Sequence, residues 1–292
     1  MDFSKLELCH IDTLRPFFAE NESRICDCTI GGTFMWRRFF NTHFAVADGV
    51  LFFRVDYFNK GQSFTPPMGS CGVEAYERLI AHCREEGVPV RLCAVSERDL
   101  MKIMDRWPRA IYETDPAWSD YVYRSTDLAT LAGRRYSGQR NHINRFIRDN
   151  PDWSFERIGA NNLPEVRSYF TESFENQPKA SITYNEGNLS TLEILDNFEA
   201  YRAVGGALRA GGRIIGASIG EITGDTLYVH TERSDLSVPG SYPVLTRSFS
   251  AEFTSDSVIY INREEDDGDE GLRNAKQSYH PAMMLQKFFV TI

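Results

Sequence analysis

A run of charged residues follows one apolar strand near the end of the chain. Between Ile261 and Pro281 the sequence reads INREEDDGDEGLRNAKQSYHP, which passes from an apolar strand through six acids to a helix. Ligands of α/β sheets gather beyond the carboxyl ends of strands, where strand-end side chains meet the amino terminus of a helix. The pattern is therefore typical of a catalytic or ligand-binding corner.

Five side chains of this corner are predicted to shape the pocket of an acceptor substrate. Asn262 and Glu264 lie where the strand ends, and Asp266 follows in the acidic loop. Arg273 and Lys276 lie on the helix, where they are placed to pair with the loop acids. Acids at a helix start also stabilise the helix dipole, so capping explains part of the run. The surplus acids suit a positively charged ammonium group.

The helix of this corner is expected to have two faces. Leu272, Ala275 and Tyr279 have the spacing of residues that pack on a sheet. Arg273 and Lys276 share the opposite face, which is either a solvated cationic surface or a set of partners for the acidic loop.

One predicted strand carries two candidate catalytic bases. His230 and Glu232 share a face of the strand Thr226–Glu232, because side chains two residues apart point the same way. Either side chain can take a proton from an attacking amine. The structural alternative is a strand-end histidine that is satisfied by its neighbours.

A basic segment precedes the second half of the chain. The stretch AGRRYSGQRNHINRFIR contains five arginines and no acid. Arg140, Asn141 and Arg145 are predicted to bind an anionic part of the donor or acceptor, and a solvated amphipathic linker helix is the alternative. The net charge of −9 excludes a general nucleic-acid surface, and in particular a DNA-binding one, since such surfaces need a dense basic face.

Composition narrows the class of protein. At 292 residues and 42% hydrophobic, the chain has enough apolar material for one large or two ordinary domains. No stretch approaches the roughly 18 to 20 apolar residues that span a bilayer, and the start lacks a secretory signal, so we expect a soluble cytoplasmic protein. The six cysteines are expected to be reduced thiols. Because no metal-binding motif is present, no metal site is predicted.

The second half of the chain has an order of elements that its hairpin turns define well. Glycine-containing turns between alternating apolar runs predict three antiparallel strands, followed by a helix, a strand, a helix and a closing strand. The predicted elements are strand Trp153–Arg157, helices Asn162–Glu175 and Leu189–Tyr201, strands Ala203–Arg209, Arg213–Thr223 and Thr226–Glu232, helix Ser241–Phe253, strand Val258–Asn262, helix Gly271–Tyr279 and strand Met284–Ile292.

The first half repeats this order more loosely. Its predicted elements are helices Ile11–Glu20 and Thr33–Phe40, a hairpin of Phe44–Ala47 with Val50–Tyr57, helix Val73–Glu86, strand Pro89–Val95 and helix Glu97–Trp107. We therefore predict an N-terminal domain over 1–133, a basic linker helix over 134–151 and a C-terminal domain over 152–292.

This order of elements resembles the Gcn5-related N-acetyltransferase (GNAT) fold, in duplicate. The segments YSGQRNHINRF and INREEDDGDEGLRNAKQSYHP carry the resemblance, which covers essentially the whole chain. They resemble a standalone bacterial family related to the C-terminal catalytic domain of lysylphosphatidylglycerol synthase, with Fem-type transferases as further relatives. The resemblance implies an α+β fold of two GNAT-like domains, each with a mixed, mostly antiparallel sheet flanked by helices.

The resemblance also implies a reaction. GNAT-type enzymes move an acyl group directly from a carrier to an amine or hydroxyl, and the carrier's phosphates normally lie on a glycine-rich turn before a helix. The corresponding turn here is SVPGSYPVL, which has one glycine and a proline that removes an amide. This departure favours aminoacyl-tRNA over acyl-CoA as the donor, and Tyr242 is predicted to contact the donor beside the turn.

The favoured function is therefore aminoacyl or acyl transfer to a small-molecule acceptor in a cleft between the two halves, with no firmly implied cofactor. An acyl-CoA-dependent N-acyltransferase is the first alternative. A non-catalytic protein that binds a metabolite or a partner is the second.

Overall fold

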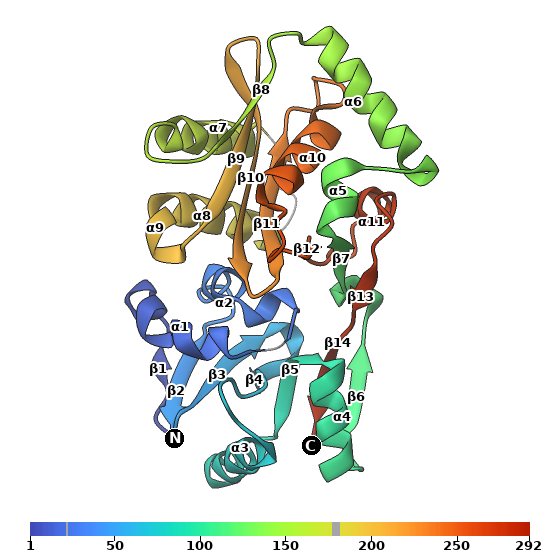
Figure 1. Ribbon diagram of the computed structural model, residues 1–292. Helices are drawn as coiled ribbons and strands as arrows, with labels where there is room; N and C mark the ends of the chain where they lie inside the picture. The colour runs from blue at the N-terminus through green and yellow to red at the C-terminus, as the bar shows by residue number, and fades with distance from the viewer. Residues whose placement is uncertain (22, 177–181) are drawn as a thin grey trace. The chain divides into compact units, whose positions relative to one another are not determined.

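The computed structural model describes residues 1–21, 23–176 and 182–292. Within these ranges the chain forms two units, each with a seven-stranded mixed sheet flanked by helices (Figure 1). Unit 1 comprises Met1–Asp120, Glu265–Glu270 and Met284–Ile292, and unit 2 comprises Tyr121–Glu264 and Gly271–Met283. In the same ranges, no helix has both the length and the apolar character needed to span a membrane.

The first sheet and its helices come mainly from the first 120 residues. The strands are β1 (Ser4–Lys5), β2 (His43–Ala47), β3 (Val50–Tyr57), β4 (Gly61–Phe64), β5 (Arg91–Ser96), β6 (Ile111–Thr114) and β14 (Lys287–Thr291). The helices are α1 (Ile11–Ala19), α2 (Ile30–Met35), α3 (Val73–Glu86) and α4 (Glu97–Arg106), with short 3₁₀ turns at Leu8–His10, Cys26–Cys28, Phe58–Lys60 and Pro116–Trp118.

The second sheet lies in the remainder of the chain. Its strands are β7 (Asp120–Arg124), β8 (Ser154–Arg157), β9 (Val204–Ala210), β10 (Arg213–Thr223), β11 (Thr226–Ser234), β12 (Tyr260–Asn262) and β13 (Met283–Leu285). The helices are α5 (Ser125–Thr130), α6 (Ser137–Asp149), α7 (Leu163–Glu175), α8 (Ile182–Asp196), α9 (Phe198–Tyr201), α10 (Ser241–Phe253) and α11 (Glu270–Gln277), with a 3₁₀ turn at Arg134–Tyr136.

The three-strand meander of unit 2 forms where the sequence predicts it. Strand β10 pairs antiparallel with both β9 and β11. Gly211, Gly212 and Gly224 all have positive φ angles, which the tight turns between these strands require and glycine adopts without strain. The hairpins are therefore set by local turn chemistry.

The two sheets have the same strand order apart from one exchanged strand. The first runs β1-β2-β3-β4-β5-β14-β6, and the second, read from its β8 edge, runs β8-β9-β10-β11-β12-β7-β13. In each sheet the fourth and fifth strands are parallel. The sixth position is exchanged, because β14 from the end of the chain lies in the first sheet and β7 lies in the second. The units are thus topological repeats that have swapped one strand.

This exchange changes the predicted domain boundaries. The strand predicted at the C-terminus exists, but β14 pairs with β5 and β6 of unit 1 instead of closing the second half. Phe288, Phe289 and Val290 are buried there and complete the core of unit 1. The apolar pattern of a strand predicts that it is buried, but it does not say in which sheet.

The predicted linker helix is also part of a unit. Ile143 and Phe146 of α6 are buried in the core cluster of unit 2, together with Val244 and Phe249 of α10. The observed division falls after Asp120, before the predicted boundary at residue 133. Helix α6 therefore packs as a core element of unit 2, since its apolar stripe covers α10.

The parallel strands of each unit separate at their carboxyl ends. The β11–β12 ladder ends at the pair Tyr228↔Asn262, although β11 continues to Ser234. The β4–β5 ladder has the single pair Phe64↔Leu92, although β5 continues to Ser96. Divergence of this kind opens a space into which side chains from both strands and the following helices project.

Candidate active site

A bulge in β11 lies at the edge of the space where β11 and β12 diverge. Ile219 pairs with Thr231 and Gly220 pairs with Val229, so His230 is the extra residue on β11. A Cβ atom at Gly220 would lie 2.0 Å from the carbonyl oxygen of Tyr228, and only glycine permits this approach. Bulges bend a strand and free backbone groups from the ladder, and they are common beside active sites.

The imidazole of His230 is held between two carboxylates. Its Nδ1 lies 2.7 Å from Oε1 of Glu264, and its Nε2 lies 3.0 Å from Oε1 of Glu221. The side chain is 2% exposed. Burial by itself would lower the pKa of His230, but hydrogen bonds to the two carboxylates outweigh burial and raise it to about 10. Near neutral pH His230 therefore carries a positive charge and donates from both nitrogens.

This protonation bears on the predicted role of His230. An imidazolium that already holds both protons has no lone pair with which to accept another. The geometry instead suits His230 to orient Glu264. The prediction that His230 and Glu232 are catalytic stays a prediction.

Glu264 is the more accessible member of this group. Its side chain is 22% exposed, and its backbone has φ 58°, which is uncommon for a residue with a Cβ. The buried Asn262 stabilises this conformation, because its Oδ1 accepts the backbone N–H of Glu264 at 2.7 Å. Backbone strain of this kind clusters at functional sites. Two residues predicted at the strand end thus act together to present one carboxylate.

Glu232 lies on β11 and bridges to the residue after β12. Its carboxylate accepts hydrogen bonds from Thr246 Oγ1 at 2.7 Å, Arg263 Nη2 at 2.9 Å and Ser218 Oγ at 3.2 Å. The guanidinium of Arg263 lies 5.3 Å from the ring centroid of Tyr279. Glu232 and Arg263 therefore span the space between the diverging strands.

Arg263 was not predicted as a site residue. Burial opposes its charge, but the carboxylate of Glu232 raises the pKa of Arg263. Its Nη1 is buried and, among the described residues, has no hydrogen-bond partner. A buried donor of this kind is costly unless a ligand satisfies it. The signal in the sequence is a single arginine inside the acidic run INREEDD, directly after an apolar strand.

Helix α11 buries a different face from the predicted one. Lys276 is 6% exposed, whereas Leu272 is 41% exposed and Ala275 is also exposed. The Nζ of Lys276 donates to the carbonyl oxygens of Arg263 at 2.6 Å and Glu264 at 3.2 Å. The prediction that Leu272 and Ala275 pack on the sheet is wrong, although Tyr279, the third residue of the predicted face, is buried in the core of unit 2. The carbonyl groups of the strained turn need a donor, and a long lysine side chain supplies it.

Three other predicted residues have different surroundings. Asp266 is buried in unit 1, where its Oδ1 accepts the N–H of Gly268 at 2.9 Å and so shapes the acidic loop. Arg273 is half-buried on α11. Tyr242 is half-buried at the start of α10, where burial raises the pKa of its hydroxyl. Their predicted contacts with substrate stay predictions.

The basic face of α6 has local partners. Arg140 Nη1 donates to the carbonyl oxygens of Leu131 and Gly133, in the segment before the helix. Arg145 pairs with Asp149 one turn later at 3.5 Å, and both side chains are largely exposed. Asn141 is exposed. Arg140 thus stabilises the entry to α6, and the anion-binding role of the three residues stays a prediction.

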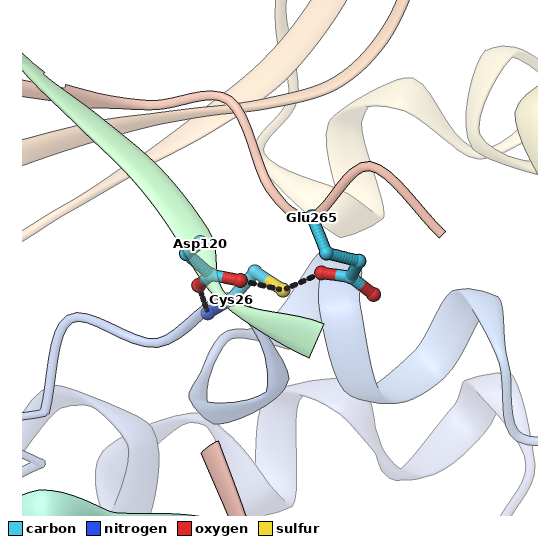
Figure 2. A group of neighbouring side chains, drawn as sticks. All are labelled: Cys26, Asp120 and Glu265. Atoms are coloured by element: carbon cyan, nitrogen blue, oxygen red, sulfur yellow. Dashed lines mark hydrogen bonds between the residues drawn. The ribbon is translucent and has the colours of Figure 1, made fainter. Parts of the chain in front are cut away.

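A second charged cluster, which no motif predicted, lies in unit 1 (Figure 2). Figure 2 shows Cys26 between the carboxylates of Asp120 and Glu265, with Sγ at 3.5 and 3.3 Å from them. The Nζ of the buried Lys287 lies 2.8 Å from Asp120 and 2.9 Å from Glu265. It also lies 2.6 Å from Asp27 and 3.2 Å from Cys26 Sγ.

The lysine ammonium occupies the centre of this cluster. Cys26, Asp120 and Glu265 have the geometry of a metal site, yet Nζ of Lys287 already lies at contact distance from all three. Burial raises the pKa of Asp120 to about 7, although Lys287 opposes the shift. Burial, reinforced by Asp120, also raises the pKa of the Cys26 thiol. The cluster is thus a buried cation with acidic partners, and its thiol is not activated.

These features define a tandem GNAT-like protein in which His230, Glu232 and Glu264 lie at the diverging parallel strands of unit 2. The family model described as phosphatidylglycerol lysyltransferase, C-terminal, matches residues 20–291, and the chain belongs to this family. A search of curated proteins found no match.

Solved structures agree with this assignment. A conserved protein of unknown function from Bacteroides thetaiotaomicron is 31% identical, with a TM-score of 0.91 over 100% of this chain and 99% of that chain. The C-terminal domain of a protein assigned as a lysylphosphatidylglycerol synthetase from Agrobacterium fabrum is 13% identical, with a TM-score of 0.70 over 98% and 92% of the chains. FemX is 10% identical, with a TM-score of 0.57 over 99% and 97%.

The predicted family and fold are therefore confirmed. The chain has two GNAT-like halves with mixed sheets flanked by helices, in the arrangement that it shares with the lysylphosphatidylglycerol synthetase domain and FemX. Family and fold together support a protein of the aminoacyl- or acyltransferase kind.

Proposed function

We propose that this protein transfers an aminoacyl group from an aminoacyl ester to an amine or hydroxyl acceptor, and that the reaction takes place in unit 2 beside Glu264. The observation that carries the proposal is the partly exposed Glu264 carboxylate, oriented by a charged His230. The preceding residue, Arg263, contacts Glu232 and has a buried N–H group with no partner among the described residues. An acyl transfer needs these two functions together, a proton acceptor and a donor for the carbonyl oxygen.

Glu264 is the proposed proton acceptor for the nucleophile. An acceptor ammonium would bind to its carboxylate and lose a proton to it, and the free amine would then attack the ester carbonyl. The new C–N bond forms as the C–O bond to the carrier breaks; the second proton on nitrogen passes to the departing carrier oxygen, and Glu264 releases its own proton to solvent. His230 is a positioning residue in this scheme, because it holds Glu264 and is itself fully protonated near neutral pH.

Arg263 is the proposed donor for the oxygen of the reacting carbonyl. Its Nη1 has no partner among the described residues, and its Nη2 is fixed by Glu232 at 2.9 Å. A guanidinium held in this way is preorganised to stabilise the negative charge that develops during attack.

The turn before α10 favours an aminoacyl-tRNA over acyl-CoA as the donor. Gly240 has φ +86°, and a Cβ there would lie 2.5 Å from the carbonyl oxygen of His142 on α6. The close approach of α6 therefore explains why residue 240 is a glycine. No bound phosphate is needed to explain it. Aminoacyl-tRNA is accordingly the proposed donor partner, and a small molecule with an amine or hydroxyl is the proposed acceptor.

The test is a transfer assay with the purified chain. Radiolabelled aminoacyl-tRNAs are incubated with a panel of amines, hydroxyl compounds and phosphatidylglycerol vesicles, and transfer of label is measured. Replacing Glu264 with Gln is expected to lower kcat/KM at least about a hundredfold, the usual scale for losing a general base. Glu199→Gln makes the same chemical change on the exposed surface of α9 and serves as the matched control.

Three results would count against this proposal. Transfer from acyl-CoA esters but not from aminoacyl-tRNA would replace the proposed donor with the conventional GNAT donor. Equal activity of Glu264→Gln and Glu199→Gln would remove Glu264 from the reaction. Binding of a metabolite without transfer from either donor would favour a non-catalytic protein.

A further inference from the structure

A cavity of about 640 Å³ lies in unit 1, apart from the residues of the proposed active site. This volume falls within the range of roughly 300 to 1,000 Å³ that is typical of small-molecule sites. Four segments that are distant in the sequence form its walls. They are residues 20–21 and 23–28, the turn over 66–71, the start of α4 over 96–102 and residues 284–286 before β14.

The cavity lies where the topology of the fold predicts a ligand. The 66–71 turn joins β4 to α3, and Ser96 is both the last residue of β5 and the N-cap of α4. The cavity thus opens at the carboxyl ends of the two parallel strands, the place where open α/β sheets bind ligands. It occupies the same topological position in unit 1 as the diverging β11 and β12 do in unit 2.

The charges around the cavity are balanced. Three basic side chains and three acidic side chains line it: Arg24, Arg98, Lys102, Glu20, Glu97 and Asp99. Lys102 and Asp99 pair at 3.2 Å, and the Ser96 hydroxyl donates to Asp99 at 2.7 Å. A simple anion would face three carboxylates here, and a simple cation would face three bases. A ligand that carries both charges satisfies both sets.

Apolar side chains complete the lining. Ile25 and Met68 are buried, and Met284 and Leu285 extend the apolar surface beside them. Apolar walls with a few placed polar groups are typical of sites for small metabolites. The ligand therefore needs an apolar portion as well as two opposite charges.

We infer that the cavity at the ends of β4 and β5 is a second ligand site, which binds a zwitterion with an apolar side chain, of the size of a free amino acid or a dipeptide. Its ammonium faces the acidic side chains, and its carboxylate faces Arg98 and the start of α4. The site is separate from the proposed transfer reaction, because all of its lining residues belong to unit 1.

Calorimetry and thermal shift on the full chain test this inference. The probes are the standard amino acids and the dipeptide leucylleucine. For leucine they include its amine analogue isopentylamine, which lacks the carboxylate, and its acid analogue isocaproate, which lacks the amino group. At least one amino acid or the dipeptide is expected to bind and raise Tm by linkage. The amine and acid analogues are expected to bind at least about tenfold more weakly.

A charge-reversal variant locates the binding. Arg98→Glu places an acid in the first turn of α4, where acids stabilise a helix, so the fold should tolerate it. It is expected to weaken binding about tenfold or more. Arg109→Glu makes the same change at an exposed position of unit 1 outside the lining and should leave binding unchanged. Glu264→Gln should also leave it unchanged, which separates this site from the proposed active site.

A chemical readout inside the same chain is independent of these variants. Cys71 is half-buried and lines the cavity, whereas Cys9 is exposed elsewhere. A bound zwitterion is expected to slow alkylation of Cys71 by iodoacetamide and leave Cys9 unaffected, as measured by peptide mass spectrometry.

Three outcomes would overturn the inference. One is the absence of binding by every amino acid and by the dipeptide. Another is equal affinity for isocaproate or isopentylamine, which would assign the site to a single charge. The third is binding that survives Arg98→Glu and leaves Cys71 unprotected, which would place the ligand elsewhere.

Discussion

The carboxyl ends of β4 and β5 in unit 1 and of β11 and β12 in unit 2 occupy the same place in the fold, but different side chains lie there. In unit 2, Glu232 and Arg263 bridge the diverging strands, and His230 lies between Glu221 and Glu264. In unit 1, the corresponding position opens into a cavity, and the buried cation beside it is Lys287 on the exchanged strand β14.

The difference concerns the buried cation at the centre of each group. Lys287 is surrounded by Asp27, Asp120 and Glu265, which outweigh burial and raise its pKa well above the usual range, so it is a permanent cation. His230 loses its proton only near pH 10, and its partner Glu264 is partly exposed. The Lys287 cluster therefore stabilises unit 1, and the group of His230 and Glu264 is available to a substrate. The predictions that follow test this contrast.

Removal of Lys287 is expected to have the largest effect. In Lys287→Met, Asp120 stays fully buried without its cation, and breaking a buried ion pair costs about 3–5 kcal/mol. The free energy of unfolding from urea denaturation measures the loss. Lys5→Met, at a largely exposed pair with Glu7, is the control and should change it by less than about 1 kcal/mol. A Lys287→Met loss as small as the control's would show that the cluster does not stabilise unit 1.

Replacement of Arg263 is expected to rank second. Arg263→Met removes one of three hydrogen bonds to Glu232, while Thr246 and Ser218 keep the other two. Loss of one hydrogen bond to a charged group costs about 1.5–3 kcal/mol, measured by the same urea denaturation. If Arg263 also stabilises the reacting carbonyl oxygen, kcat falls more than KM changes. A rise in KM with unchanged kcat would assign Arg263 to ground-state binding instead.

The pH dependence of stability is expected to distinguish His230. Its pKa is raised from 6.5 to about 10 on folding, so the stability that it contributes is complete below pH 6.5 and is lost as pH rises through about 10. The limiting slope is about 1.4 kcal/mol per pH unit. Urea denaturation of His230→Gln between pH 7 and 9 should show a shallower fall than the unmodified chain. Parallel curves for the two proteins would mean that His230 does not gain its proton on folding.

The exposed face of α6 is expected to give the smallest effect. Arg145 and Asp149 are largely exposed, and Arg145→Ala should change the free energy of unfolding by less than about 0.5 kcal/mol. A large increase in KM for the tRNA donor, without a change in stability, would instead support the predicted anion-binding role. Salt titration of KM checks this, because phosphate contacts weaken steeply with ionic strength.

Much of the candidate site could be predicted from local patterns. The end of a strand placed Asn262 and Glu264 together. Alternation predicts that His230 and Glu232 share a face, and this prediction is wrong because the bulge at His230 interrupts the alternation. His230 contacts Glu221 and Glu232 contacts Ser218, which lie three residues apart on β10 and point to opposite faces. The pattern did not reveal that His230 is charged, because its pKa depends on Glu221, which lies on the neighbouring strand β10. Cross-strand partners depend on register, and a bulge shifts the register here.

The cluster of unit 1 could not be predicted in this way. Cys26, Asp120, Glu265 and Lys287 come from four segments separated by up to 261 residues. One signal was present, since Lys287 opens the apolar strand KFFVT, where an unpaired lysine would be costly. Its partners follow only from the placement of β14 beside β5.

The sequence by itself determined the family, most of the helices and strands, the hairpin turns and the strand-end residues of unit 2, but it did not predict β1, β4, β6, β7 or α5. These depend on periodicity, turn chemistry and motifs, all of which act over short stretches of chain. The tertiary structure alone decided the exchange of β7 and β14, the buried face of α11, the charge of His230 and the cavity of unit 1. Each of these depends on which distant segments pack together and exclude water. The neighbours with which a segment is buried set both its strand pairing and the protonation of its side chains.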